Sequence, residues 1–164
     1  MPFAYYQKLS TRDKKTYRES DRIENIEIPE PATLREPVAT LEKSLGHGRR
    51  AATQKAAQNL IDQLTKALGV SPLRVKVLER RPSWQTGELH GLYEARELGP
   101  RVISVWMRTA QRIQVVKFKT FLRTLLHELC HHLDYEYFHL GESFHTEGFF
   151  KRESSLLRQL YPPT

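Results

Sequence analysis

The spacing of apolar residues predicts three helices between Arg49 and Leu160. Between Arg49 and Leu68, apolar residues recur at helical spacing, and Gly69 follows where such a helix would end. A clearer helical pattern runs from Val116 to about Tyr137. We expect a further helix to begin near Ser143, whose side chain can cap it, and to run to about Leu160.

Two runs between the first two of these helices predict strands. Leu73–Leu78 alternates apolar with cationic residues, and Val102–Met107 is an almost continuous apolar run. Glycines at positions 87 and 91 interrupt Trp84–Tyr93, which we interpret as a turn and a short strand. Strands grouped between helices indicate the α+β class, with a small antiparallel or mixed sheet.

The first 45 residues follow neither pattern. Lys8–Arg22 is dense in charge and has too few apolar residues for a strong amphipathic helix. Pro29, Pro31 and Pro37 then exclude one continuous helix and favour an extended strap or linker. We therefore divide the chain into a charged, proline-containing extension, residues 1–45, and a domain formed by residues 46–164.

Composition fits a single domain with an extension. The chain has 164 residues, of which 39% are hydrophobic and 27% charged. Cys130 is its only cysteine, so no intramolecular disulfide can form, which suits a reducing compartment. No segment approaches the roughly 20 apolar residues of a membrane span, and residues 1–8 lack the apolar part of a secretory signal. We therefore expect a cytoplasmic protein without a membrane partner.

The net charge of +7 and the isoelectric point of about 9.6 suit a polyanionic partner such as nucleic acid. Five cations precede or begin the helix predicted from Val116: Arg108, Arg112, Lys117, Lys119 and Arg123. A solvated basic face has the same pattern, so DNA or RNA binding is one of two interpretations.

The segment His127-Glu128-Leu129-Cys130-His131 has the HExxH pattern of zinc enzymes. On a helix, its two histidines lie one turn apart and can reach the same ion. Four leucines fall within about 80° of one another and form a core-facing stripe: Leu122, Leu125, Leu129 and Leu133. Five polar residues fall within about 80° on the far side: Thr120, Thr124, His127, His131 and Asp134. Both histidines therefore avoid the core, although solvated histidines would do so too.

This arrangement assigns roles to the polar residues of the helix. Zinc with three protein ligands keeps a position for water and lowers the pKa of that water toward about 7. Glu128 can accept a proton from the water and pass it to the leaving amine. Asp134 could fix the tautomer of a ligating imidazole, although ordinary solvation explains this residue almost as well. His132 turns toward the leucine stripe and is expected to be structural.

A third ligand must come from beyond His131. His145 follows a turn at Gly141 and lies near the start of the last predicted helix. Glu147 is its strongest rival, because a carboxylate also serves as third ligand in HExxH peptidases. Glu142 and His139 are weaker candidates.

The HExxH segment, followed by a loop, His145 and Phe149, resembles the SprT-like zinc metallopeptidases, the family with the Spartan-like HExxH domain. The resemblance covers roughly residues 49–160, and residues 126–150 carry its specific part. It implies a minimal zincin-type domain in which His127, His131 and His145 bind Zn²⁺ and Glu128 is the general base. It also implies that the strand Val102–Met107 pairs with an extended peptide substrate.

These observations predict a zinc-dependent endopeptidase that hydrolyses peptide bonds with a water activated by Glu128. Two alternatives remain open. The chain could be a zinc-binding, nucleic-acid-associated adaptor without peptidase activity. It could also be a latent protease whose cleft is blocked by residues 1–45.

Overall fold

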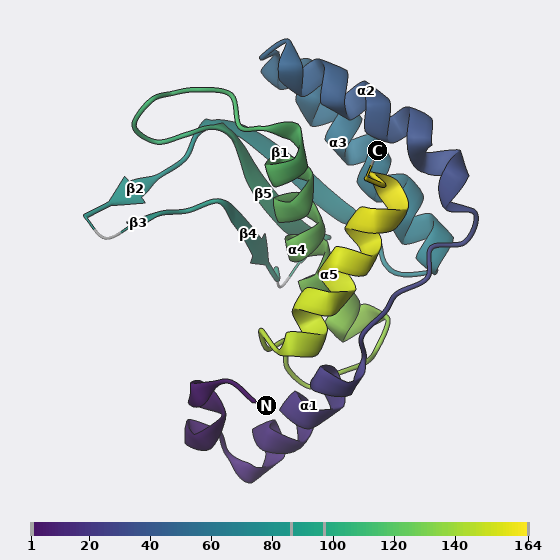
Figure 1. The fold of residues 1–164 in the computed structure, drawn as a ribbon, viewed down its shortest axis with the longest axis vertical. Coiled ribbons are helices and arrows are strands. Elements are labelled where there is room, and N and C mark those ends of the chain that lie inside the picture. The colour runs from purple at the N-terminus through teal and green to yellow at the C-terminus, as the bar shows by residue number, and fades with distance from the viewer. Residues whose placement is uncertain (1, 86, 97, 164) are drawn as a thin grey trace.

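The computed structural model describes residues 2–85, 87–96 and 98–163. These residues form an α+β structure in which helices accompany a small mixed sheet (Figure 1). In chain order the elements are η1 (Ala4–Lys8), α1 (Thr11–Arg22), η2 (Pro31–Leu34), α2 (Arg35–Gly46), α3 (Arg50–Leu68), β1 (Leu73–Arg80), β2 (Ser83–Trp84), β3 (Gly87–Glu88), β4 (Gly91–Glu94), β5 (Arg101–Arg108), α4 (Phe118–Glu136) and α5 (Glu147–Leu160). None of these helices is long and apolar enough to cross a membrane.

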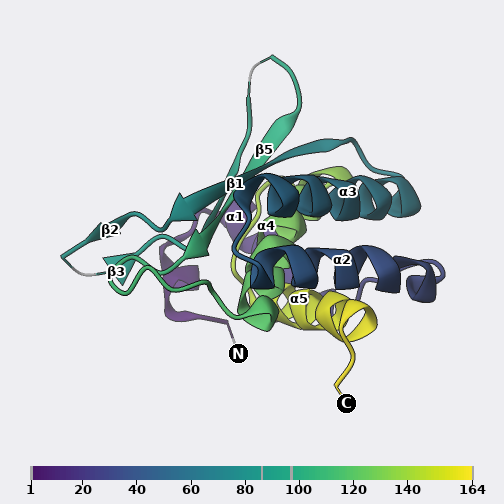
Figure 2. The same cartoon turned by 90° about the horizontal axis from the view of Figure 1, so that it is seen from above.

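The main sheet has the order β1-β5-β4, with β5 parallel to β1 and antiparallel to β4. Strands β2 and β3 form a separate antiparallel hairpin. Strand β5 is paired along both edges, and its residues Val102–Met107 are also buried on both faces, which explains its continuous apolar sequence. Strand β1 instead alternates, burying Val75 and Val77 and exposing Arg74 and Lys76. The helices lie on the buried side of this sheet (Figure 2).

Three helix predictions are confirmed to within a few residues. Helix α3 ends at Gly69, whose φ of 69° is the left-handed conformation that glycine tolerates best. Helix α4 buries all four leucines of the predicted stripe. Helix α5 begins later than predicted, because Thr146 and not Ser143 is its N-cap. The Thr146 side chain accepts a hydrogen bond of 2.9 Å from the backbone N–H of Phe149.

The prediction of a strap or linker before α3 is right only for residues 23–30, which form no helix or strand, and the other residues of this region are mostly helical. Ser10 caps a regular helix, α1, which buries Tyr17. The prolines did not prevent the next helices, because Pro31 begins η2 and Pro37 lies in the first turn of α2, where the missing N–H costs nothing. Six apolar residues of this region enter the common core: Ile26, Ile28, Leu34, Val38, Leu41 and Leu45.

Candidate metal site

Three imidazoles meet beside helix α4. His127 and His131 lie one turn apart on α4, and His145 comes from the loop before α5. The Nε2 atom of His145 lies 3.1 Å from that of His127 and 3.0 Å from that of His131. Two nitrogens about 2.05 Å from a tetrahedral zinc would be about 3.3 Å apart. The three side chains could therefore hold a metal ion with little rearrangement.

A buried carboxylate orients the first of these imidazoles. The Nδ1 atom of His127 lies 2.6 Å from an Oε atom of Glu153 on α5. The other Oε atom of Glu153 accepts a hydrogen bond of 2.9 Å from Arg123. An ionised carboxylate only accepts hydrogen bonds, so the proton of neutral His127 is held on Nδ1. Its Nε2 lone pair is then free to bind a metal.

A hydroxyl does the same for His131. Its Nδ1 atom lies 2.7 Å from Ser143 Oγ, and Ser143 in turn donates a hydrogen bond of 2.7 Å to Asp134. Since the Ser143 proton is used on Asp134, its oxygen accepts the proton on His131 Nδ1. Asp134 therefore reaches this imidazole through Ser143. Both α4 histidines present unprotonated Nε2 atoms to His145, which is the form that metal binding requires.

Asp134 continues this network into the core. Its other oxygen accepts a hydrogen bond of 2.9 Å from Arg152, and both side chains are fully buried. Arg152 also donates to the backbone oxygens of Ser20 and Ile23 at the end of α1, at 2.6 Å each. The chain of contacts from His131 thus ends in the N-terminal segment.

The surroundings of His131 and His145 lower the pKa of both imidazoles. Phe149 lies under all three rings, with centroid distances of 5.0, 4.8 and 5.2 Å to His127, His131 and His145. Burial, followed by the neighbouring His127 and His145, lowers the pKa of His131 to about 3. Burial and the nearby His127 also lower the pKa of His145. A protonated imidazole cannot bind a metal, so these shifts favour binding at neutral pH.

Glu128 lies between two hollows that flank the histidines. One hollow, of about 440 Å³, extends past His127 and is bounded by Thr124 and Phe150. The other, of about 540 Å³, extends past His131 and is bounded by Tyr93 and other aromatic and polar groups. Burial is the main cause that raises the pKa of Glu128 to about 7. A carboxyl group with that pKa can both accept and donate a proton near neutral pH.

Strand β4 forms one wall of this region. Tyr93 stacks on His131 with ring centroids 6.2 Å apart. The backbone of Gly91 lies so close to α4 that an added Cβ would be 2.7 Å from Thr124 Cγ2 and 3.1 Å from Glu128 Oε2. In the described part of the sheet, β4 pairs with β5 on one side only. The expectation that Val102–Met107 presents the open edge is wrong, because β5 is paired on both sides.

The rival ligands lie elsewhere. Glu147 is exposed and lies 3.4 Å from Lys151. Glu142 accepts hydrogen bonds from the Tyr135 hydroxyl and the Ser143 N–H. His139 is exposed and takes a positive φ of 54° in the turn after α4.

Other residues singled out on α4 are buried in the structure. His132 is buried, with Nδ1 3.0 Å from the Tyr93 hydroxyl and Nε2 2.8 Å from the Ser71 carbonyl oxygen. Cys130 is a buried free thiol. The expectation that His132 turns toward the core is confirmed, and its two hydrogen bonds agree with a structural role.

Sequence reasoning did not find Glu153, Arg152 or the contact between Ser143 and His131. One signal was present in α5. Phe149, Leu156 and Leu160 recur at helical spacing and are buried, and Arg152 and Glu153 interrupt that buried face with charges. Charged residues at core positions of an amphipathic helix need partners, which here are groups around the histidines.

No family model, no curated protein and no solved structure matches the chain significantly. The fold and the site define an α+β protein with a cluster of three histidines and an adjacent buried glutamate.

Proposed function

We propose that the protein is a zinc-dependent endopeptidase with a minimal zincin-type catalytic domain. The observation that carries the proposal is the convergence of the Nε2 atoms of His127, His131 and His145 next to the buried Glu128. It agrees with the resemblance of residues 126–150 to SprT-like metallopeptidases. The ligands are His127, His131 and His145, and the cofactor is Zn²⁺.

The substrate would lie along β4. An extended peptide can add to an open strand edge through main-chain hydrogen bonds. The edge of β4 passes Glu128 at Gly91 and His131 at Tyr93. Side chains on either side of the scissile bond would then enter the two hollows beside Glu128. We therefore propose that the substrate pairs with β4 and not with β5.

Each residue has a defined role in hydrolysis. Zinc held by the three imidazoles would lower the pKa of water and polarise the scissile carbonyl group. Glu128 accepts one proton from the attacking water and delivers it to the nitrogen of the leaving amine as the C–N bond breaks. Glu153 and Ser143 keep the protons of His127 and His131 on Nδ1. Phe149 excludes water from beneath the imidazoles.

The test separates metal binding from catalysis. Purified protein should carry about one zinc per chain, and His127→Ala or His131→Ala should lose most of it. Glu128→Gln should keep zinc and the fold but lose hydrolysis of an unstructured protein by at least about 100-fold. Metal content that neither histidine substitution changes would refute the zinc site. Equal turnover by wild type and Glu128→Gln would refute catalysis by Glu128.

The alternatives make different predictions in the same assays. A zinc-binding adaptor would keep zinc and show no turnover in the wild-type protein. A latent protease would gain activity when the N-terminal segment is displaced. The described residues 2–45 line neither hollow beside Glu128, and this favours an accessible cleft.

A further inference from the structure

The third histidine lacks the support that the other two receive from a helix. His127 and His131 are fixed by the backbone hydrogen bonds of α4. His145 precedes the N-cap of α5 and lies in a loop, where no regular ladder sets its backbone position. The position of its imidazole therefore depends on contacts that the loop makes with other segments.

Ser143 and Glu142 tie the start of this loop to α4, and the contacts at Phe144 and at the His145 backbone come from the N-terminal segment. The Tyr5 hydroxyl donates a hydrogen bond of 2.8 Å to the backbone oxygen of His145 itself. Tyr5 also packs on Phe144, with ring centroids 6.4 Å apart, and Tyr17 packs on the same ring at 6.1 Å. The backbone N–H of Phe3 donates to the Tyr17 hydroxyl at 2.8 Å, which ties η1 back to α1.

The residues just after His145 are held by the end of α1. The hydroxyls of Ser20 and Thr146 lie 3.0 Å apart, and both residues are fully buried. The Gly148 N–H donates to the Asp21 carboxylate at 3.1 Å. A Cβ added at Gly148 would be 2.6 Å from the backbone oxygens of Ser20 and Asp21, so only glycine permits this approach. Figure 1 shows α1 and the N-terminus beside the start of α5.

We propose that residues 3–21 form an intramolecular brace that positions His145 as a metal ligand, with Tyr5 as the positioning residue. The proposal rests on the zinc site described above and deepens it. In this proposal the N-terminal segment supports the metal site, whereas in a latent protease it would block the cleft. The segment completes the metal site from outside the cleft, because it touches the backbone of the third ligand and the cap of the following helix.

Tyr6 provides a matched control for Tyr5. Both tyrosines lie on η1, but the Tyr5 hydroxyl donates to the His145 backbone oxygen, whereas the Tyr6 hydroxyl accepts a hydrogen bond from Arg18. Tyr5→Phe and Tyr6→Phe each remove one tyrosine hydroxyl group and keep the ring. Loss of one uncharged hydrogen bond corresponds to a change of about five-fold in affinity. Tyr5→Phe should therefore weaken zinc binding about five-fold in chelator competition, and Tyr6→Phe should leave it within two-fold of wild type.

Three further measurements test whether the effect acts through His145. In Co²⁺-loaded protein, Tyr5→Phe should change the visible absorption spectrum, which reports ligand geometry, and Tyr6→Phe should not. In a His145→Ala background, Tyr5→Phe should cause no further loss of metal affinity. Amide hydrogen exchange of residues 144–148 in the metal-free protein should be faster in Tyr5→Phe than in Tyr6→Phe.

The outcomes separate this proposal from the proposed function. Equal zinc affinities and equal cobalt spectra for the two variants would overturn the brace and leave the zinc site intact. An effect of Tyr5→Phe that persists in the His145→Ala background would also overturn it, because the route would not pass through His145. A wild-type protein that binds no zinc would overturn both proposals.

Discussion

Glu153 binds two cationic or proton-donating groups at once, His127 through one carboxylate oxygen and Arg123 through the other. Partners of this kind fix the orientation of a ligating imidazole, and their removal costs about 10- to 100-fold in metal affinity. We expect Glu153→Gln to weaken zinc binding by at least about ten-fold, since an amide is a weaker acceptor for the His127 proton.

Glu147 supplies the control for this prediction. It lies on the same helix and has the same side chain, but it is exposed and pairs with Lys151. Glu147→Gln should leave zinc affinity within two-fold of wild type. The reverse order of the two effects would make Glu147 the important carboxylate and would contradict the assignment of His145 as third ligand.

The raised pKa of Glu128 predicts how pH changes stability. In the metal-free protein this pKa is about 7, against 4.5 for an unperturbed glutamate. Between these values the folded state binds more protons than the unfolded state, so the Glu128 contribution to stability falls as pH rises. This difference in the pKa of Glu128 lowers the free energy of unfolding by at most about 3 kcal/mol above pH 7.

Glu128→Gln removes this titration. The metal-free variant should therefore be more stable than wild type at pH 8, and the difference should disappear below about pH 4.5. Chemical denaturation at several pH values, with a chelator present, measures the difference. The low pKa of His131 acts in the opposite sense, lowering stability as pH falls below about 6.5, but it is common to both proteins. A constant difference across this range would contradict the raised pKa.

At the scale of elements, β4 lies close to α4 because position 91 is a glycine, which leaves room for Thr124 and Glu128. Gly91→Ala would push β4 away from Thr124 and Glu128. We expect this substitution to reduce peptide hydrolysis by about ten-fold or more while zinc content stays unchanged, because a displacement of about 1 Å is sufficient for such a loss. Gly87→Ala is the control, since its new Cβ would make only ordinary contacts of 3.8 Å or more with Trp84. Equal activity of the two variants would remove β4 from the substrate site.

The elements that the sequence predicted well are those with a repeating apolar pattern. Helices α3 and α4 have such patterns over 19 residues each, and a period of this length leaves little ambiguity. Helix α1 has few apolar residues, and its main buried side chain, Tyr17, packs on residues far away in the chain. No local pattern could show that.

The same limit applies to the candidate site, where the sequence predicted the local motif but not the contacts between elements. His127 and His131 belong to one local motif, so their spacing alone predicted that they share a helix face. Glu153 and the contact of Ser143 with His131 depend on how α5 and its loop pack on α4, which is tertiary information. The order of β5 and β4 was also missed, because a continuous apolar run does not reveal which edges of a strand are paired.

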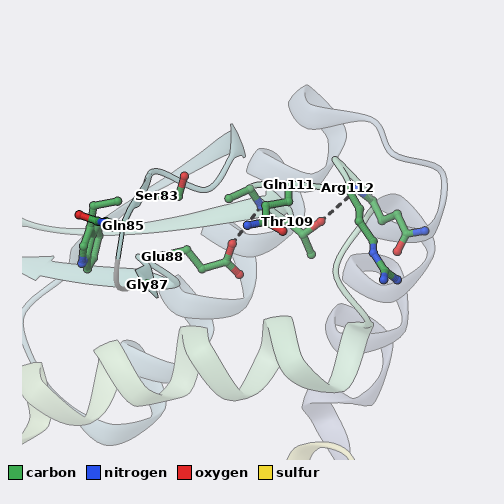
Figure 3. A pocket seen from close by; sticks show the side chains of 10 residues that line it. Ser83, Gln85, Gly87, Glu88, Thr109, Gln111 and Arg112 are labelled. Carbon is green, nitrogen blue, oxygen red and sulfur yellow. Dashed lines mark hydrogen bonds between the residues drawn. The ribbon is translucent and has the colours of Figure 1, made fainter.

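At the scale of the whole molecule, the net charge is +7, but some of the cations expected to bind nucleic acid near α4 are paired with acidic side chains. Arg108 and Arg123 form ion pairs with Glu79 and Glu153. Arg112 instead lines a hollow of about 510 Å³ between the β2–β3 hairpin and the loop after β5 (Figure 3). Trp84, which is 57% exposed, lies on the hairpin side of this hollow. Arg112 and Trp84 line this hollow together with the acidic Glu88. Proteins that bind single-stranded nucleic acid combine cations with exposed aromatic rings.

If this surface binds single-stranded DNA or RNA, affinity should fall steeply as salt concentration rises. Arg112→Ala should reduce the slope of log affinity against log salt by about one, and Trp84→Ala should weaken binding with little change in slope. Lys66→Ala, on an exposed position of α3, is a control for general charge. Absence of a mobility shift for the wild-type protein at low salt would exclude this partner.

The contact between Tyr5 and His145 joins residues 140 positions apart. Contacts of such long range form late in folding, because a large loop must close before they contribute any free energy. During synthesis, His127 and His131 emerge before His145 and Glu153, so a growing chain first displays two imidazoles without the third or its carboxylate partner. Zinc would then reach its full affinity only after the N-terminal segment has docked on the His145 loop, so the rate of that tightening would report a late step of folding.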